Sequence, residues 1–102
     1  MNVSLFGAIM KLSVEEIKIK CKEDKFASIK YVRIGNDFRY AVAGGYTEHW
    51  ELVEKGEIPT SAGFFSLFHD NELHLHETPS TSLKLGPLKE DSDFLKTIFE
   101  AQ

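Results

Sequence analysis

The 102-residue chain has a single cysteine, three prolines and no hydrophobic run long enough to cross a bilayer. The lone Cys21 excludes an intrachain disulfide and is typical of a reducing compartment, so we expect a cytoplasmic protein. The apolar stretch 3–10 lacks the positive region of a signal peptide and is too short for a membrane span. We therefore expect neither a secreted protein nor a membrane protein.

An excess of one charge is also missing, because 12 Lys and Arg stand against 16 Asp and Glu, for a formal net charge of −4. This balance gives no electrostatic reason to expect nucleic acid or an anionic membrane as a partner. Glycine-rich phosphate loops, HExxH and CxxC are absent, so we expect no cofactor. The 42% hydrophobic content indicates a folded chain. We expect one domain over 1–102, in which 1–11 is a candidate for a loosely attached N-terminal segment.

Alternating apolar residues predict two paired strands, Ser28–Ile34 and Phe38–Ala43. Between them, Gly35-Asn36-Asp37 has the composition of a turn. A short edge strand is predicted at Leu83–Leu85, where Gly86-Pro87 ends the pattern. These segments indicate a sheet that is mostly antiparallel.

The segment Leu12–Cys21 has two interpretations. Ser13 and Glu16 have the spacing of a helix capping box. Apolar residues then alternate with lysines through Cys21, and alternation is the pattern of a strand. We favour a strand that begins at about Glu16.

Two helices are predicted in the second half of the chain. Thr47 is suited to cap a helix over 48–55 that Gly56 ends, with a strand as the rival interpretation. Asp91 or Ser92 caps the last helix. The order β-β-β-α-β-β-β-α predicts an α+β domain in which helices cover one side of the sheet. The last helix has an apolar stripe at helical spacing, formed by Phe94, Leu95, Ile98 and Phe99.

A β-hairpin is predicted over Gly63–Glu77, where two apolar runs flank a two-residue turn at Asp70-Asn71. In this register Leu67 faces His74. The face predicted to be polar holds Phe65, Leu67, His69, Glu72, His74 and His76. The face predicted to join the core holds Phe64, Ser66, Phe68, Leu73 and Leu75.

This hairpin carries three of the four histidines. His74 and His76 are two apart on a strand and project to one face, as two ligands of one divalent metal must. The predicted register brings a carboxylate and a third imidazole to the same face. The solvated side of a sheet has the same pattern, so both interpretations stay open. The candidate metal ligands are His69, Glu72, His74 and His76.

His49 is the candidate for catalysis. A neutral imidazole near the N-terminus of the predicted helix, beside free backbone N–H groups, is suited to attack a phosphoryl group. A half-buried helix histidine is the alternative interpretation.

Short segments between Lys30 and about Phe99 follow one another as in the Janus/ocnus phosphohistidine phosphatases, and the chain resembles that family in this respect. The family's arginine before a Gly-Tyr pair is Gly44 here, so Arg39 would substitute for it. The segments that carry the resemblance are Lys30-Tyr31-Val32, Gly45-Tyr46, His49 with Glu54-Lys55, Asp70 with Leu73-His74-Leu75, and Ser82 with Gly86-Pro87.

The resemblance implies a small α+β phosphatase. His49 would be its nucleophile or general base. Its phosphate ligands would be Lys30, Arg39 and Ser82.

Our leading hypothesis is a small α+β module that binds a protein partner or a small ligand without catalysis. This hypothesis requires only a compact core, an acidic surface and an exposed edge strand. Such an edge recruits a strand of a partner or of a second copy, so a homodimer is among the expected assemblies. The alternatives are a phosphohistidine phosphatase-like hydrolase that uses His49, and a metal-binding hairpin.

Overall fold

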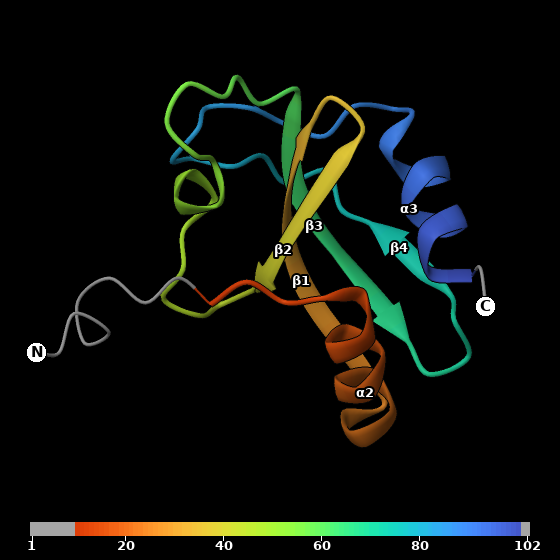
Figure 1. The fold of residues 1–102 in the computed structure, drawn as a ribbon. Helices are drawn as coiled ribbons and strands as arrows, with labels where there is room; N and C mark the ends of the chain where they lie inside the picture. The colour runs from red at the N-terminus through yellow and green to blue at the C-terminus, as the bar shows by residue number, and fades with distance from the viewer. Residues whose placement is uncertain (1–9, 101–102) are drawn as a thin grey trace, which may run out of the picture.

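The computed structural model describes residues 10–100 (Figure 1). The four strands form one antiparallel sheet in the order β2-β1-β3-β4. The predicted α+β class with a C-terminal helix is therefore confirmed. No helix within 10–100 is long and apolar enough to cross a membrane. The elements are α2 (Val14–Asp24), β1 (Phe26–Ile34), β2 (Asp37–Val42), the 3₁₀ helix η1 (His49–Leu52), β3 (Ser61–Phe68), β4 (Leu73–Leu75) and α3 (Asp91–Glu100).

The hairpin of β1 and β2 has the turn that the sequence predicts. Tyr31 pairs with Tyr40, and the pairing ends at Ile34 and Asp37. Gly35 in the turn has a φ of 64°, in the left-handed region that a residue without Cβ adopts at little cost. β1 lies between β2 and β3, and six of its nine residues are buried, as expected of a central strand.

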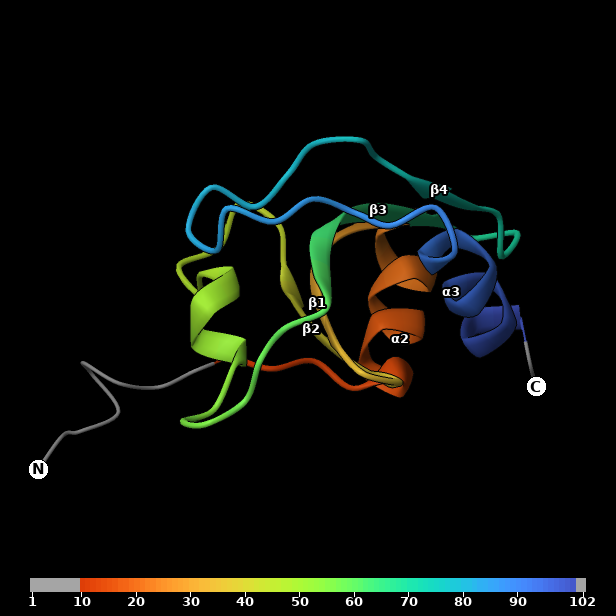
Figure 2. The same ribbon diagram turned by 90° about the horizontal axis from the view of Figure 1, so that it is seen from above.

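The helices α2 and α3 pack on the same face of the sheet (Figure 2). In α3, Leu95 and Phe99 are fully buried, as the apolar stripe predicts, whereas Phe94 is 43% exposed beside Phe38. The aromatic ring of Phe99 contacts those of Tyr40 and Phe65. The core on this face consists of Ile17, Cys21, Ala27, Ile29, Tyr31, Tyr40, Phe65, Leu67, Leu73, Leu95 and Phe99.

The opposite face carries a smaller apolar cluster under η1 and the 81–85 segment. Leu52 of η1 is fully buried against Val32 of β1 and its neighbours. Towards the other end of this face, Phe68 lies between the rings of Phe26 and His74. This end of the face is more open, and Phe26 is 49% exposed.

The strand predicted from about Glu16 is wrong, because 14–24 is the helix α2. Its capping box is present: the Ser13 side chain accepts from the Glu16 N–H, and the Glu16 carboxylate accepts from the Ser13 N–H. Ile17 and Cys21, four residues apart, are buried, whereas Ile19 is 55% exposed. A strand would have placed all three apolar residues on one face, whereas the helix turns Ile19 away from the buried side.

The segment predicted as a helix over 48–55 forms only the short 3₁₀ helix η1, whose N-cap is Glu48 and not Thr47. Gly56, with a φ of 89°, lies in the turn that follows. Leu83–Leu85 is not an edge strand, because 81–84 is a turn closed by an isolated bridge between Ser80 and Leu85. Its two leucines instead pack against the smaller cluster.

A buried polar network attaches the first turn of α3 to the sheet. The Asp91 carboxylate is fully buried and accepts from the Tyr31 hydroxyl at 2.5 Å, the Arg33 guanidinium at 2.9 Å and the Leu88 N–H at 2.9 Å. Arg33 also donates to Glu90 at 2.6 Å. These contacts fix where α3 begins and how it lies against the sheet.

Candidate functional site

The hairpin of β3 and β4 differs by one residue from the predicted register. Ser66 pairs with His74, and Leu67 pairs with Leu73. The Phe68 N–H donates to the Glu72 carbonyl, so the loop has three residues, and its last residue, Asn71, has a φ of 71°. A three-residue loop that ends in a left-handed residue is common in hairpins.

This shift turns β3 over relative to the prediction, while Leu73 and Leu75 of β4 keep their predicted place on the core face. Phe65 and Leu67 join Leu73 in the core under the α-helices. Ser66 and His74 lie on the opposite face, where the His76 ring accepts or donates a hydrogen bond at 2.9 Å to the Ser66 hydroxyl. The predicted core face was therefore wrong for β3 and correct for Leu73 and Leu75 of β4.

The outer edge of β4 has unpaired backbone groups. His76 N–H donates to the Phe64 carbonyl and Phe68 N–H to the Glu72 carbonyl, with the Ser66–His74 pair between them. Bonded and non-bonded pairs alternate along an antiparallel ladder. The N–H and C=O groups of Leu73 and Leu75 therefore point away from β3, toward the outside of the sheet.

The other edge of the sheet is partly covered. At β2, the Leu12 N–H donates to the Tyr40 carbonyl at 2.9 Å in an isolated antiparallel bridge. The segment around Leu12 is itself held by a hydrogen bond from the Met10 N–H to the Thr47 hydroxyl. β4 is thus the edge of the sheet that is more open to an added strand.

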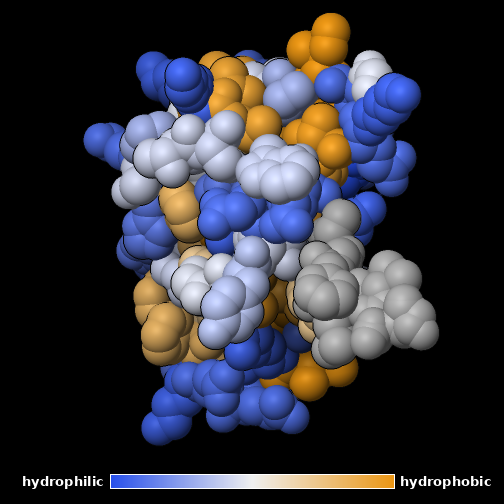
Figure 3. All heavy atoms as spheres, turned by 90° about the vertical axis from the view of Figure 1, so that its left-hand side faces the viewer, coloured by the Kyte–Doolittle hydropathy of each residue, from blue (hydrophilic) through white to orange (hydrophobic). Residues whose placement is uncertain are grey.

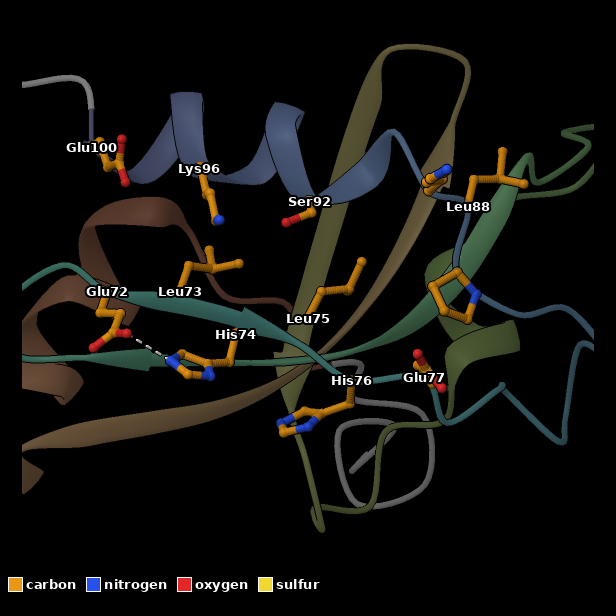
Figure 4. Close-up of a pocket in the computed structure, with 12 residues that line it drawn as sticks. Glu72, Leu73, His74, Leu75, His76, Glu77, Leu88, Ser92, Lys96 and Glu100 are labelled. Carbon is orange, nitrogen blue, oxygen red and sulfur yellow. Dashed lines mark hydrogen bonds and ion pairs between the residues drawn. The ribbon is translucent and has the colours of Figure 1, made fainter.

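A groove of about 770 Å³ runs between this edge and α3 (Figure 4). Leu73 and Leu75 point from β4 toward the helix, and Ser92 and Lys96 point from the helix toward the strand, whereas His74 points away from it. The groove is lined by residues 72–77, by 87–89 in the connection to α3, and by Ser92, Lys96 and Glu100 of α3.

The chemistry of the groove suits a polypeptide backbone. Its floor is apolar at Leu73, Leu75 and Leu88, and its rim carries charges of both signs. The helix wall presents Ser92, Lys96 and Glu100 at intervals of four residues. The Asp91 network anchors the first turn of this helix wall to β1. An extended segment that enters could bond to β4 and touch the helix at the same time.

The candidate metal ligands are divided by the observed register. His74 Nε2 bonds to Glu72 at 2.9 Å and His76 Nε2 bonds to Ser66, on the face opposite the α-helices. His69 instead lines a second cavity, of about 370 Å³, against α2. Among residues 10–100, no three His, Cys, Asp or Glu side chains are placed to hold one metal ion. The geometry gives the metal hypothesis no support.

Cys21 lies at the same second cavity but is not placed as a nucleophile. It is 3% exposed, and its Sγ donates to the Leu67 carbonyl at 3.2 Å. Burial, followed by the charge of Asp70, raises the pKa of the thiol. The cysteine therefore behaves as a small buried apolar residue.

His49, the candidate nucleophile, is 3% exposed and packs edge-on against Phe64. Its Nε2 bonds to the Gly63 carbonyl at 2.9 Å. Burial lowers the pKa of His49, as does the charge of Lys30, while the Gly63 carbonyl and Glu48 oppose this effect. The imidazole is therefore neutral at pH 7, but its burial leaves a substrate no access to it.

The three residues that the resemblance assigns to phosphate are engaged elsewhere. Lys30 is 5% exposed, and its Nζ donates to the Thr47 carbonyl at 2.7 Å. Arg39 bonds to Glu57 through both terminal nitrogens. Ser82 lies in the 81–84 turn with its Oγ 3.4 Å from that of Ser80. The phosphatase hypothesis stays a prediction that these contacts do not favour.

On the side of the molecule that carries η1, hydrophobic residues form small separate patches among hydrophilic ones (Figure 3). Trp50 in η1 is 55% exposed but lines neither of the two cavities described above. The groove between β4 and α3 combines a cavity, an apolar floor and free backbone groups. It is therefore the strongest candidate site within residues 10–100.

Sequence reasoning missed the helix wall of this groove. Ser92, Lys96 and Glu100 lie on the polar side of a helix that was expected only to cover the sheet. Their four-residue spacing was visible, but nothing local shows that this side of α3 faces a free strand edge. No family model matches the chain, and no curated protein or solved structure matches it.

Proposed function

We propose that this protein is a non-catalytic binding module that takes an extended polypeptide segment as an added strand along β4. The observation that carries the proposal is the pair of outward-pointing peptide groups at Leu73 and Leu75, which lie in a groove walled by α3. A segment in this position continues the antiparallel sheet and lays alternate side chains against the groove.

The available bonds set the strength of such binding. Leu73 and Leu75 together offer two N–H and two C=O groups, and a net hydrogen bond contributes about 0.5–1.5 kcal/mol. Contact with the apolar floor adds to this, and ordering the segment opposes it. We therefore expect micromolar or weaker affinity for a single segment. The chain has a single cysteine, which suits a reducing compartment, and we propose a cytoplasmic location.

A displayed library of random 12-residue peptides tests the proposal, with selection on the wild-type protein. Enriched peptides should carry apolar residues at every second position, because one face of the added strand meets the groove. Their binding should slow hydrogen exchange at the amides of Leu73 and Leu75. Enrichment of peptides that protect other amides, or no enrichment, would contradict the proposal.

Two variants at one position separate the backbone from the side chain. Leu75→Pro removes an N–H that points outward, so the pairing with β3 is kept while the added strand loses a donor. Leu75→Ala keeps the N–H and removes the side chain. Selected peptides should lose at least about tenfold in affinity on the proline variant, from the lost bond and the steric block. The alanine variant should bind more tightly than the proline variant.

A further inference from the structure

We infer that one occupant of the groove is a second copy of this chain, joined through an antiparallel pair of β4 strands related by a two-fold axis. This inference rests on the proposed function, since both use the outward peptide groups of Leu73 and Leu75. It adds the identity of the partner and a single register. The two sheets would become one continuous sheet, with one α3 from each copy on the same side.

The sequence of β4 is complementary to itself in this register. With His74 on the axis, Leu73 of one copy faces Leu75 of the other, and the two exchange hydrogen bonds in both directions. Glu72 of one copy then faces His76 of the other, twice per dimer. Glu72 and His76 lie on the same face as His74, as their hydrogen bonds to His74 and Ser66 show.

Neighbouring registers are less complementary. Moving the axis to Leu73 places Leu75 opposite Asn71. Asn71 has a left-handed backbone conformation in the hairpin turn, so it cannot continue a strand. Moving the axis to Leu75 places Leu73 opposite Glu77 and the imidazole of His74 opposite that of His76. Only the register centred on His74 pairs both leucines with leucine and both carboxylates with an imidazole. Cross-strand pairs of opposite charge stabilise a sheet, and an imidazole donates to a carboxylate whether neutral or charged.

The fold leaves room for this partner. No other strand of residues 10–100 pairs with the outer edge of β4, which faces the groove. An isologous contact of this kind closes at two copies, because each β4 has only one free edge. The α3 walls then flank the joint strands and offer Ser92 and Lys96 to the other copy.

Sedimentation equilibrium of the full chain from about 1 µM to 1 mM tests the inference. The wild-type protein should show a monomer–dimer equilibrium within this range. His76→Glu places two carboxylates opposite each other at both pairs and should raise the dimer dissociation constant about tenfold. Adding Glu72→His to that variant exchanges the pair and should restore the constant to within about threefold. His69→Glu makes the same change in the exposed turn and should leave it unchanged.

The leucine variants complete the test, with circular dichroism as the check that each variant is folded. Leu75→Pro should be monomeric at 1 mM, and Leu75→Ala should still dimerise. The inference would be overturned if Leu75→Pro still formed dimers. It would also be overturned if the dimer dissociation constant did not change in His76→Glu or was not restored by the added Glu72→His. A wild-type chain that stays monomeric at 1 mM but binds selected peptides at β4 would overturn the second copy alone. A monomer that also binds no peptide would overturn the proposed function with it.

Discussion

Replacing Asp91 by asparagine tests how α3 is held against the sheet. The carboxylate is fully buried and has three donors, at 2.5, 2.9 and 2.9 Å, from Tyr31, Arg33 and the Leu88 N–H. Burial alone would raise the pKa of Asp91, but the hydrogen bonds from Tyr31, Leu88 and Arg33 outweigh it and lower the pKa. Asparagine keeps the shape and removes the charge, so the Arg33 guanidinium loses its buried partner.

The expected loss follows from the burial of both charges. The Arg33 side chain is 8% exposed, and its remaining carboxylate partner, Glu90, is 57% exposed. Breaking a buried ion pair by removing one partner costs about 3–5 kcal/mol. Asparagine can still accept from the Leu88 N–H, so we expect about 3 kcal/mol. With a urea dependence of about 1–3 kcal/mol per molar, the unfolding midpoint should fall by about 1–3 M.

Urea unfolding followed by circular dichroism at 222 nm measures this loss. Asp93→Asn is the matched control, because Asp93 lies in the same first turn but is exposed. It should lose only the interaction with the helix dipole, about 0.3–1 kcal/mol. If Asp91→Asn and Asp93→Asn unfold at the same urea concentration, the Asp91 network does not anchor α3.

Three further predictions concern stability. Tyr31→Phe removes one hydrogen bond to a buried charge and should cost about 1.5–3 kcal/mol in the same urea assay; a loss below about 0.5 kcal/mol would contradict the network. Ser13→Ala removes the capping box of α2 and should cost about 1 kcal/mol, whereas an unchanged midpoint would show that α2 does not depend on its cap. Hydrogen bonds from Arg39 and from the Glu54 N–H lower the pKa of Glu57 to about 2. The Glu57 carboxylate therefore contributes its full stabilisation above the pKa of an unfolded glutamate, about 4, and this stabilisation is lost as the pH falls toward 2. Urea midpoints at pH 6, 4 and 3 should therefore fall less steeply in Glu57→Gln than in the wild type, and equal slopes would contradict this assignment.

The parts of the fold that the sequence predicts correctly are those with local signals that agree. The hairpin of β1 and β2 has alternation on both sides of a glycine turn, and the turn residue Gly35 has the positive φ that its type permits. α3 has an apolar stripe with a single period, and Leu95 and Phe99 of that stripe are buried. No second interpretation competed in either segment.

Where two local signals conflict, the pattern that extends over more residues predicts the wrong element. In 14–24 the alternation of Ile17, Ile19 and Cys21 with lysines favours a strand, whereas the capping box favours the helix that forms. The helix buries two of these three apolar residues, Ile17 and Cys21, and leaves Ile19 half-exposed. Contact with the sheet, which sequence alone does not supply, decides between the two periods.

The candidate site was misplaced for a related reason. Whether the turn at Asp70-Asn71 has two or three residues decides which side chains of β3 share a face with Leu73 and Leu75 of β4. In the three-residue turn that forms, Asn71 has a left-handed backbone conformation. Asparagine is equally compatible with a two-residue turn, so the residue type does not tell the two turn lengths apart. The expected edge strand at Leu83–Leu85 is a turn, so the free edge belongs to β4. Finding this edge requires the strand order, which is a long-range property.

Amide hydrogen exchange of β4 tests the central claim most directly. The proposed strand addition predicts that the amides of Leu73 and Leu75 exchange fast in dilute protein, because they have no partner. They should become protected as the protein concentration rises or when a selected peptide is added, while His74, already bonded to β3, changes little. Protection of Leu73 and Leu75 that is the same at every concentration and with every peptide would contradict strand addition at this edge.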